Sequence, residues 1–375
     1  MKVVVIGGGI AGLSIGWRLA QAGAQVTVVE RAQPGGGATL ASAGMIAPTA
    51  ERVGVESPEA KFARAAAALW PAFAAEVEQA SNHKVTYRPD GTILVARTAA
   101  EAQDLAARVA AVPGCQILTA GDARALEPLL EGHIEFAVFD PAEAQVDNRA
   151  IGLALARAFV RAGGVLQSNE TIVRLEVMPN GALAAVSPFA SYKADAIVVA
   201  AGAWAGRIET VPPGLAPPVI PVKGEMIALT PDIASGFPRR VIWGHEVYLV
   251  PRHGRLFVGA TMARVGYDTA LTQGAVGWLR SRAEALMPAL AQWEEAEHWA
   301  GLRPGTPDDL PILGETAVPG LYVAGGQFRN GILLAPAMAE ALSSLILERR
   351  STYELSAFDP RRFNKTLVDQ AETSR

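Results

Sequence analysis

The sequence contains a single cysteine, Cys115, among its 375 residues. One thiol can form neither an intramolecular disulfide nor a cysteine metal cluster, so the composition indicates a reducing compartment and we expect a cytoplasmic location. Histidine is scarce as well. No two of the five histidines stand at the four-residue spacing typical of zinc sites on a helix, so we expect no metal site.

Charge is also sparse. Only 19% of the residues are charged, the net charge is −4, and no run of basic residues occurs. This balance excludes the basic footprint of a nucleic-acid-binding protein and a polybasic membrane patch. Small molecules are therefore the expected partners.

Long apolar runs are missing too. Crossing a bilayer takes about 20 consecutive apolar residues, and no stretch reaches that length. The run from Met1 to Trp17 has the outline of a secretory signal, but Gly7, Gly8 and Gly9 interrupt it, and it fits a strand, a turn and a helix better. We predict a soluble chain with no transmembrane segment.

Glycine, in contrast, is abundant, with 37 residues, and its first cluster lies between predicted elements. A β-branched run at 2–6 predicts a buried strand, the apolar spacing over 10–22 predicts a helix, and 25–29 predicts the next strand. The pattern is that of a βαβ unit with a glycine turn at its first crossing.

That turn matches G-x-G-x-x-G at Gly7, Gly9 and Gly12. Gly7 permits a tight turn, Gly9 lets the backbone approach a pyrophosphate, and Gly12 allows close packing of the helix on the strand. Glu30 follows about twenty positions later, where an acidic residue accepts hydrogen bonds from a ribose. This context predicts a dinucleotide site with the helix N-terminus at the phosphates.

The same segment also matches G-x-S-x-G, through Gly12, Ser14 and Gly16. In a hydrolase elbow the serine lies directly at the end of the strand, whereas Ser14 falls inside the predicted helix. We therefore reject a serine hydrolase.

The residues after Glu30 indicate which dinucleotide binds. A small-residue stretch from Gly35 to Met45 stands where a nicotinamide enzyme usually continues into another strand and helix. Such backbone can lie along an extended cofactor and donate N–H groups to it, which favours FAD over NAD. A surface loop without a ligand is the alternative.

An arginine near the C-terminus is the candidate substrate residue. Arg303 stands between apolar and glycine neighbours, and a buried guanidinium needs a partner, which a substrate carboxylate could provide. A structural salt bridge is the alternative. Downstream, a strand ends at Gly326 and a helix begins near Ile332, so a second helix N-terminus would face the flavin ring and stabilise negative charge on it.

Dinucleotide-fold elements thus occur at the start, middle and end of the chain. The expected fold class is α/β with an α+β second domain: a Rossmann-like FAD-binding domain built from discontinuous segments and an antiparallel-sheet substrate-binding domain. The predicted FAD-binding segments are 1–85, 145–220 and 300–375. The predicted substrate-binding segments are 86–144 and 221–299.

Over nearly its whole length the sequence resembles the D-amino-acid oxidase family of FAD enzymes, and within it the glycine oxidases of the thiamine pathway. The N-terminal fingerprint is shared by many flavoproteins. The more specific motifs are Ser42–Met45, Val219–Gly224, Val247–Pro251, Gly259–Met262, Gly301–Thr306 and Phe328–Pro336.

The resemblance implies roles for individual residues. Arg303 corresponds to the arginine that holds the substrate carboxylate, Tyr248 to a tyrosine that orients it, and Arg329 to a residue beside both substrate and flavin, while Met262 would line the small substrate cavity. The implied flavin contacts are Ile10, Ala11, Glu30, Arg31, Ala38, Thr39, Ala43, Gly44, Met45, Val173, Gln327, Phe328, Arg329, Asn330, Gly331, Ile332 and Leu333.

Two positions depart from that family pattern. Gln327 and Glu246 stand where histidines are familiar, which leaves the preferred amino acid open. Relatives that attach flavin covalently use a cysteine near the C-terminal flavin site or a histidine in the N-terminal loop. Because Cys115 lies elsewhere and residues 31–60 contain no histidine, we expect non-covalent FAD.

The resemblance implies oxidative deamination of glycine, sarcosine and small D-amino acids, with dioxygen as oxidant and peroxide, ammonia and glyoxylate or another 2-oxo acid as products. No catalytic side chain is expected, since orientation and flavin chemistry suffice. A homo-oligomer is a further expectation. The alternatives are a D-amino-acid dehydrogenase or a cyanide-forming glycine dehydrogenase subunit that passes electrons to a quinone or partner protein, and a flavin-binding subunit with a structural duty.

Overall fold

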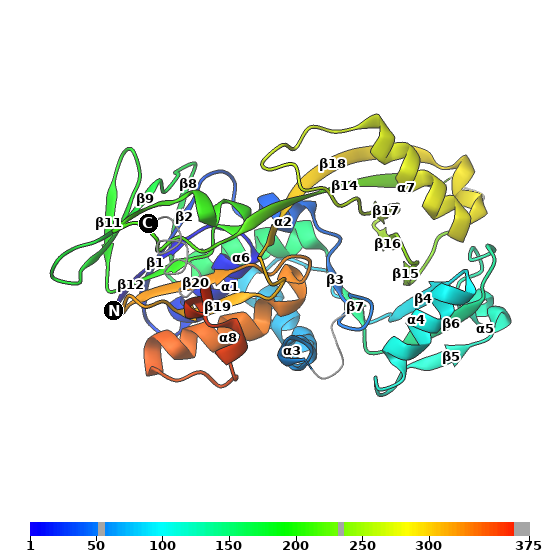
Figure 1. The fold of residues 1–375 in the computed structure, drawn as a ribbon, viewed down its shortest axis with the longest axis horizontal. Coiled ribbons are helices and arrows are strands. Elements are labelled where there is room, and N and C mark those ends of the chain that lie inside the picture. The colour runs from blue at the N-terminus through cyan, green and yellow to red at the C-terminus, as the bar shows by residue number, and fades with distance from the viewer. Residues whose placement is uncertain (52–56, 232–235, 364–375) are drawn as a thin grey trace, which may run out of the picture.

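The fold is seen in a computed structural model that describes residues 1–51, 57–231 and 236–363. Two large sheets dominate it, one at each end of the view in Figure 1, and the long strands β14 and β18 run between the two halves. Residues 364–375, the end of the predicted FAD-binding segments, lie outside the described part.

The first sheet is six-stranded, in the order β19-β20-β12-β1-β2-β8. Its central strands are parallel, and β19 pairs antiparallel with β20 at one edge. The strands are β1 (Lys2–Ile6), β2 (Gln25–Glu30), β8 (Val165–Ser168), β12 (Ala196–Val199), β19 (Ile312–Glu315) and β20 (Leu321–Gly325). The discontinuous origin of this sheet agrees with the α/β fold that the sequence predicts.

Both faces of the first sheet are buried, which explains the uninterrupted β-branched run at its start. Val3 and Val5 face one core, while Val4 and Ile6 face another. Four helices cover the first face: α1 (Ile10–Gln21), α3 (Pro58–Ser81), α6 (Asn148–Arg161) and α8 (Gly331–Glu348). The helix α8 is apolar and long enough to span a bilayer, but 61% of it is buried inside the protein. It packs as a core helix against α1 and α3.

A smaller antiparallel meander covers the other face. It consists of β9 (Arg174–Val177), β10 (Leu183–Val186), β11 (Ser191–Ala194) and β13 (Glu209–Val211), the last of which pairs parallel with β9. Residues 174–177 therefore belong to this separate small sheet and not to the first sheet. The strand β9 alternates Arg174 and Glu176 with apolar residues, as a half-exposed strand does, whereas β12 is buried throughout.

The second sheet is eight-stranded, in the order β18-β14-β17-β16-β15-β4-β6-β5. Neighbouring strands are antiparallel except for β4 and β15, which pair in parallel. The strands are β4 (Thr92–Ala96), β5 (Gln116–Leu118), β6 (Phe136–Asp140), β14 (Ile220–Thr230), β15 (Val241–Trp243), β16 (Tyr248–Arg252), β17 (Arg255–Gly259) and β18 (Glu294–Gly305). They come from both predicted substrate-binding segments, and the domain limits themselves stay a prediction.

Short elements complete the structure. A two-stranded ladder joins β3 (Met45–Ile46) to β7 (Ala144–Gln145). The remaining helices are α2 (Gly37–Ala41), α4 (Ala99–Val109), α5 (Ala120–Leu126), α7 (Gln273–Leu286), and the 3-10 turns η1 (Gly202–Arg207), η2 (Pro288–Gln292), η3 (Ser356–Phe358) and η4 (Pro360–Phe363). Ser14 lies within α1 and is fully buried, as the rejection of a hydrolase elbow requires.

Candidate active site

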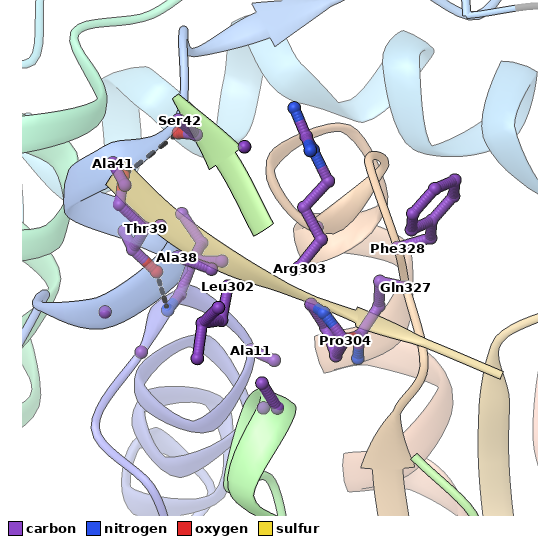
Figure 2. A pocket seen from close by; sticks show the side chains of 18 of the residues that line it. Ala11, Ala38, Thr39, Ala41, Ser42, Leu302, Arg303, Pro304, Gln327 and Phe328 are labelled. Atoms are coloured by element: carbon purple, nitrogen blue, oxygen red, sulfur yellow. Dashed lines mark hydrogen bonds between the residues drawn. The ribbon is translucent and has the colours of Figure 1, made fainter. Parts of the chain in front are cut away.

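A cavity of about 930 Å³ lies where the two large sheets meet. Its volume is near the upper end of the roughly 300–1,000 Å³ of small-molecule sites. In Figure 2, α2 and the Ser42 that follows it line one side, through Ala38, Thr39, Ala41 and Ser42. Gln327 and Phe328 line the other side, and Arg303 extends from β18 between them in this view. The cavity is therefore built by segments that are far apart in the sequence.

The glycine turn forms the first end of the cavity. Gly7 has a φ of +107°, and a Cβ there would lie 2.4 Å from the Ala200 carbonyl oxygen. A Cβ on Gly12 would lie 2.0 Å from the Gly7 carbonyl oxygen, so Gly12 serves packing and does not line the cavity. Gly9 caps α1 without a side-chain hydrogen bond, and the positive end of this helix opens onto the cavity.

Glu30 lines the cavity and also fastens the turn. Its Oε2 accepts a 2.6 Å hydrogen bond from the Gly8 amide, and its Oε1 accepts a 2.9 Å bond from the Ala32 amide. Each carboxylate oxygen retains a further lone pair for a ligand. The predicted ribose contact stays a prediction, while the fastening of the turn is a role that the sequence did not indicate.

The small-residue stretch after Glu30 is an ordered part of the wall rather than a surface loop. Its residues 37–41 form α2, and the Thr39 hydroxyl accepts a 2.9 Å hydrogen bond from the Ile10 amide. The Asn148 side chain donates to the carbonyls of Thr39 and Leu40, at 3.1 and 2.8 Å. These bonds hold α2 against the starts of α1 and α6.

A second helix N-terminus points at the same cavity. The helix α8 follows Asn330, whose side chain makes no capping bond, and Gln327, Phe328 and Arg329 line the cavity just before it. The Phe328 amide donates 2.8 Å to the Pro304 carbonyl, which fixes the turn on β18. The Gln327 Nε2 is buried and has no hydrogen-bond partner within the described ranges, so it is available to a ligand.

These features fit an extended, anionic dinucleotide. Two helix N-termini offer positive potential at separate points, and the buried Gln327 amide lacks a partner that a polar ring edge would supply. Cys115 does not line the cavity and packs instead beside a separate apolar cluster around β4, and burial raises the pKa of its thiol to about 12. The cradle therefore suits a dinucleotide that is held without a cysteine link.

Arg303 is the principal cation at the end of the cavity away from the glycine turn. Its Nη1 donates to the Thr261 carbonyl at 3.1 Å and to the Lys223 carbonyl at 3.4 Å. Within residues 1–51, 57–231 and 236–363, no carboxylate lies within ion-pair distance of it. The alternative of a structural salt bridge is thus not seen there, and the charge faces the cavity.

Tyr248 lies beside this guanidinium. Its ring packs on Trp243 with centroids 5.2 Å apart, and Gly259 leaves it room, since a Cβ there would lie 2.5 Å from the ring. Burial raises the pKa of Tyr248 despite the opposing effect of Arg303. The phenol is therefore protonated at neutral pH and can donate a hydrogen bond.

Arg329 differs from Arg303 because it already has a carboxylate. Its Nε lies 2.8 Å from Glu51 Oε2, and its Nη2 donates 3.2 Å to the Glu51 carbonyl. Glu51 lines the cavity, and burial raises its pKa, with Arg329 and then Arg303 acting in the opposite direction. Glu51 could not be predicted from the sequence, because nothing in its local pattern distinguishes it from a surface glutamate.

The structure brings most of the predicted residues to one cavity. Gly12, Asn330 and Leu333 are the predicted residues that do not line it, and Leu333 lies in the core, where its carbonyl accepts a 3.0 Å bond from Trp70 Nε1. Met262 lies in the lining and is 65% exposed, at the mouth. Lining residues that the sequence did not indicate include Glu51, Trp204, Gly224, Met226, Trp243, His245 and Trp278.

Glu246, the replacement for a familiar histidine, also lines the cavity. It pairs with Arg282 at 3.0 Å, and Arg282 in turn lies 5.1 Å from the Trp278 ring. The negative charge of Glu246 is thus paired with the guanidinium of Arg282 on α7.

Comparisons with known proteins agree with this geometry. Residues 2–345 match the family DAO, described as FAD dependent oxidoreductase. The chain is 33% identical to glycine oxidase of Geobacillus kaustophilus over 95% of each protein, and the crystal structure of that enzyme superposes with a TM-score of 0.90, 32% identity and coverage of 96% and 99%. Iminodiacetate oxidase from Chelativorans sp. BNC1 superposes with a TM-score of 0.86 at 26% identity, covering 96% and 98%.

A longer protein matches as well. The chain is 35% identical to the bifunctional protein ThiO/ThiG of Synechocystis sp. over 97% of its own length and 54% of that protein. The chain thus spans about half the length of this relative and nearly all of the glycine oxidase.

Proposed function

The chain belongs to the DAO family of FAD-dependent oxidoreductases, and we propose that it oxidises glycine and other small amino acids with dioxygen. Glycine, water and dioxygen would give glyoxylate, ammonia and hydrogen peroxide. Sarcosine would release methylamine in place of ammonia, and small D-amino acids would give ammonia and the corresponding 2-oxo acid. The names of the glycine oxidase and of the iminodiacetate oxidase support an amine-bearing acid as the substrate.

The observation that carries this proposal is the guanidinium of Arg303, which has no carboxylate partner among the described residues and faces a cavity that fits a dinucleotide. The carbonyls of Thr261 and Lys223 orient its Nη1, Tyr248 lies beside it, and N–H groups remain for a carboxylate. Such charge-assisted, bidentate contacts are among the strongest hydrogen bonds that proteins make. Arg303 would therefore fix the acid end of the substrate.

The other residues would set the orientation. The protonated Tyr248 hydroxyl can donate to the same carboxylate, and Arg329 lies on the cofactor side of the site. FAD, when bound, supplies the two-electron oxidation of the α carbon and passes the electrons to dioxygen. The chain itself would contribute positioning, water exclusion, and the positive end of α8 near developing negative charge.

A peroxide assay tests the proposal. The purified holoenzyme is supplied in air with glycine, sarcosine, D-alanine and D-proline, and we expect peroxide equal to the amino acid consumed. Anaerobic bleaching of the flavin without peroxide in air would instead indicate a dehydrogenase that uses another acceptor. Absence of bleaching by all four substrates would contradict the proposal.

Further attributes of the protein are proposed together with this activity. We propose non-covalent FAD, supported by the position of Cys115, and a cytoplasmic location, supported by the lone cysteine. A homo-oligomer is supported by the exposed Leu153 and Val160 on α6. A thiamine-pathway role and the predicted domain limits follow from the resemblance noted above.

A further inference from the structure

Two guanidinium groups and one carboxylate of the described residues gather around Tyr248. Arg303, Arg329 and Glu51 line the cavity beside it, and all three influence its pKa. Within the part of the chain that the structure describes, Glu51 pairs with Arg329, and Arg303 has no carboxylate at ion-pair distance. Arg303 is therefore available to the carboxylate of a ligand.

The carboxylate of Glu51 pairs with Arg329 and not with Arg303. Glu51 Oε2 lies 2.8 Å from Arg329 Nε, and its side chain is 7% exposed. Glu59, the next acidic residue along the chain that the structure describes, accepts a 3.0 Å bond from Asn330 and does not line the cavity. Glu51 is thus the acidic side chain that occupies Arg329 on the cavity side.

The backbone before Glu51 is fixed. The amides of Thr49 and Ala50 donate to Glu143 Oε1, at 2.8 and 2.9 Å, and Glu143 is fully buried. The Glu51 amide donates 3.0 Å to the Ala47 carbonyl, which closes a turn. The Glu51 carboxylate therefore contacts Arg329 from a segment whose backbone is held in place by hydrogen bonds.

We propose that Glu51 determines substrate specificity by occupying Arg329, so that the site accepts amino acids with one carboxylate and rejects those with two. A second carboxylate near Arg329 would meet a buried like charge, and removing that charge would expose a guanidinium that can bind it. This inference rests on the proposed function, since it takes Arg303 as the site of the first carboxylate.

The variant Glu51→Gln tests the inference because it keeps the shape of the side chain and removes its charge. Binding of acetate and malonate to the holoenzyme is measured from the change in the flavin visible spectrum. We expect malonate to bind on the order of tenfold more tightly in Glu51→Gln than in the wild type, with acetate changed much less. Turnover of iminodiacetate relative to glycine should rise in parallel.

Two further variants make the result specific. Glu246→Gln removes a cavity carboxylate that pairs with Arg282 instead, and it should leave the malonate-to-acetate ratio unchanged. The double variant Glu51→Gln/Arg329→Met should lose the gain, because the freed guanidinium is gone. The inference is overturned if Glu51→Gln retains its flavin spectrum and the ratio stays at the wild-type value, if Glu246→Gln shifts the ratio equally, or if the double variant keeps the gain.

The same measurements distinguish failure of the proposed function from failure of the specificity role of Glu51. If the wild type neither binds acetate nor oxidises glycine, both proposals fall. If the wild type does both, and Glu51→Gln does not favour malonate, the specificity role alone is wrong.

Discussion

Gly224 and Arg303 lie so close that a Cβ on the glycine would be 2.4 Å from Arg303 Nη1. Gly224 belongs to β14 and Arg303 to β18, the long paired strands that connect the two halves of the molecule. The missing side chain is thus what lets the guanidinium lie flat along β14 and reach the cavity.

Gly224→Ala should therefore displace the guanidinium while sparing the fold. The clash involves the end of a flexible side chain rather than backbone, so we expect KM for glycine to rise on the order of tenfold or more, with Tm within a few degrees of the wild type. Gly277→Ala is the control, since its Cβ meets nothing within 4 Å. Equal KM values in the two variants would show that Gly224 does not position Arg303.

Arg303→Ala should weaken binding of the substrate carboxylate by about 2–5 kcal/mol, as expected for truncating one partner of a buried charged pair. The loss should appear in kcat/KM for glycine and in the Kd for acetate by about the same factor. Unchanged kinetics for glycine and D-alanine would contradict the assignment of Arg303.

Thr39→Val removes the acceptor for the Ile10 amide at the start of α1. A buried N–H left without a partner costs about 1–3 kcal/mol, so FAD affinity should fall roughly five- to a hundredfold. Titration of the apoprotein with FAD by fluorescence quenching measures it. Thr39→Ser keeps the hydroxyl and should bind FAD within a few-fold of the wild type.

Glu143 gives stability a defined pH dependence. Burial raises its pKa from 4.5 to about 8, so between these values the native protein holds a proton that the unfolded chain has released. The free energy of unfolding then falls as pH rises through this window. Glu143→Gln should remove that fall, so the drop in Tm from pH 5 to pH 8 should be smaller than in the wild type, by on the order of a few degrees.

The matched control for this pH effect is Glu131→Gln, which removes one exposed carboxylate. Its Tm should follow the wild-type curve. Parallel curves for Glu143→Gln and the wild type would show that the buried carboxyl does not titrate in this window.

Denaturation should release the flavin. The thiol of Cys115, with its pKa near 12, is protonated at neutral pH and lies outside the cavity lining. After precipitation with acid, all flavin absorbance should remain in the supernatant, for both the wild type and Cys115→Ser. Flavin that sediments with the protein would show a covalent link.

Local patterns predicted the strand, glycine turn and helix at the start of the chain well. The residues 2–6 are apolar without interruption because both faces of β1 are covered, and the glycines that follow have conformations or contacts that a side chain would disturb. Burial of a strand and the shape of a tight turn each constrain residues that are close in the sequence, so a short sequence motif is enough to predict them.

The substrate half was less predictable because it depends on distant pairings. The register of β14 and β18 places Val222 opposite Arg303, residues about eighty positions apart, and no local pattern encodes this match. The ion pair between Glu51 and Arg329 is equally remote. Arg303 and Arg329 could be named from their motifs, whereas Glu51 required the fold.

The position of β20 also bears on how the protein is made. This strand pairs with β12 inside the first sheet, and α8, directly after it, packs on α1. During synthesis the first 200 residues therefore leave the ribosome with one edge of β12 and one apolar face of α1 uncovered, and both stay uncovered until residues 321–348 have been made. An unpaired strand edge beside an apolar helix face favours aggregation, so the interval before β20 and α8 emerge is the vulnerable stage in the folding of this sheet.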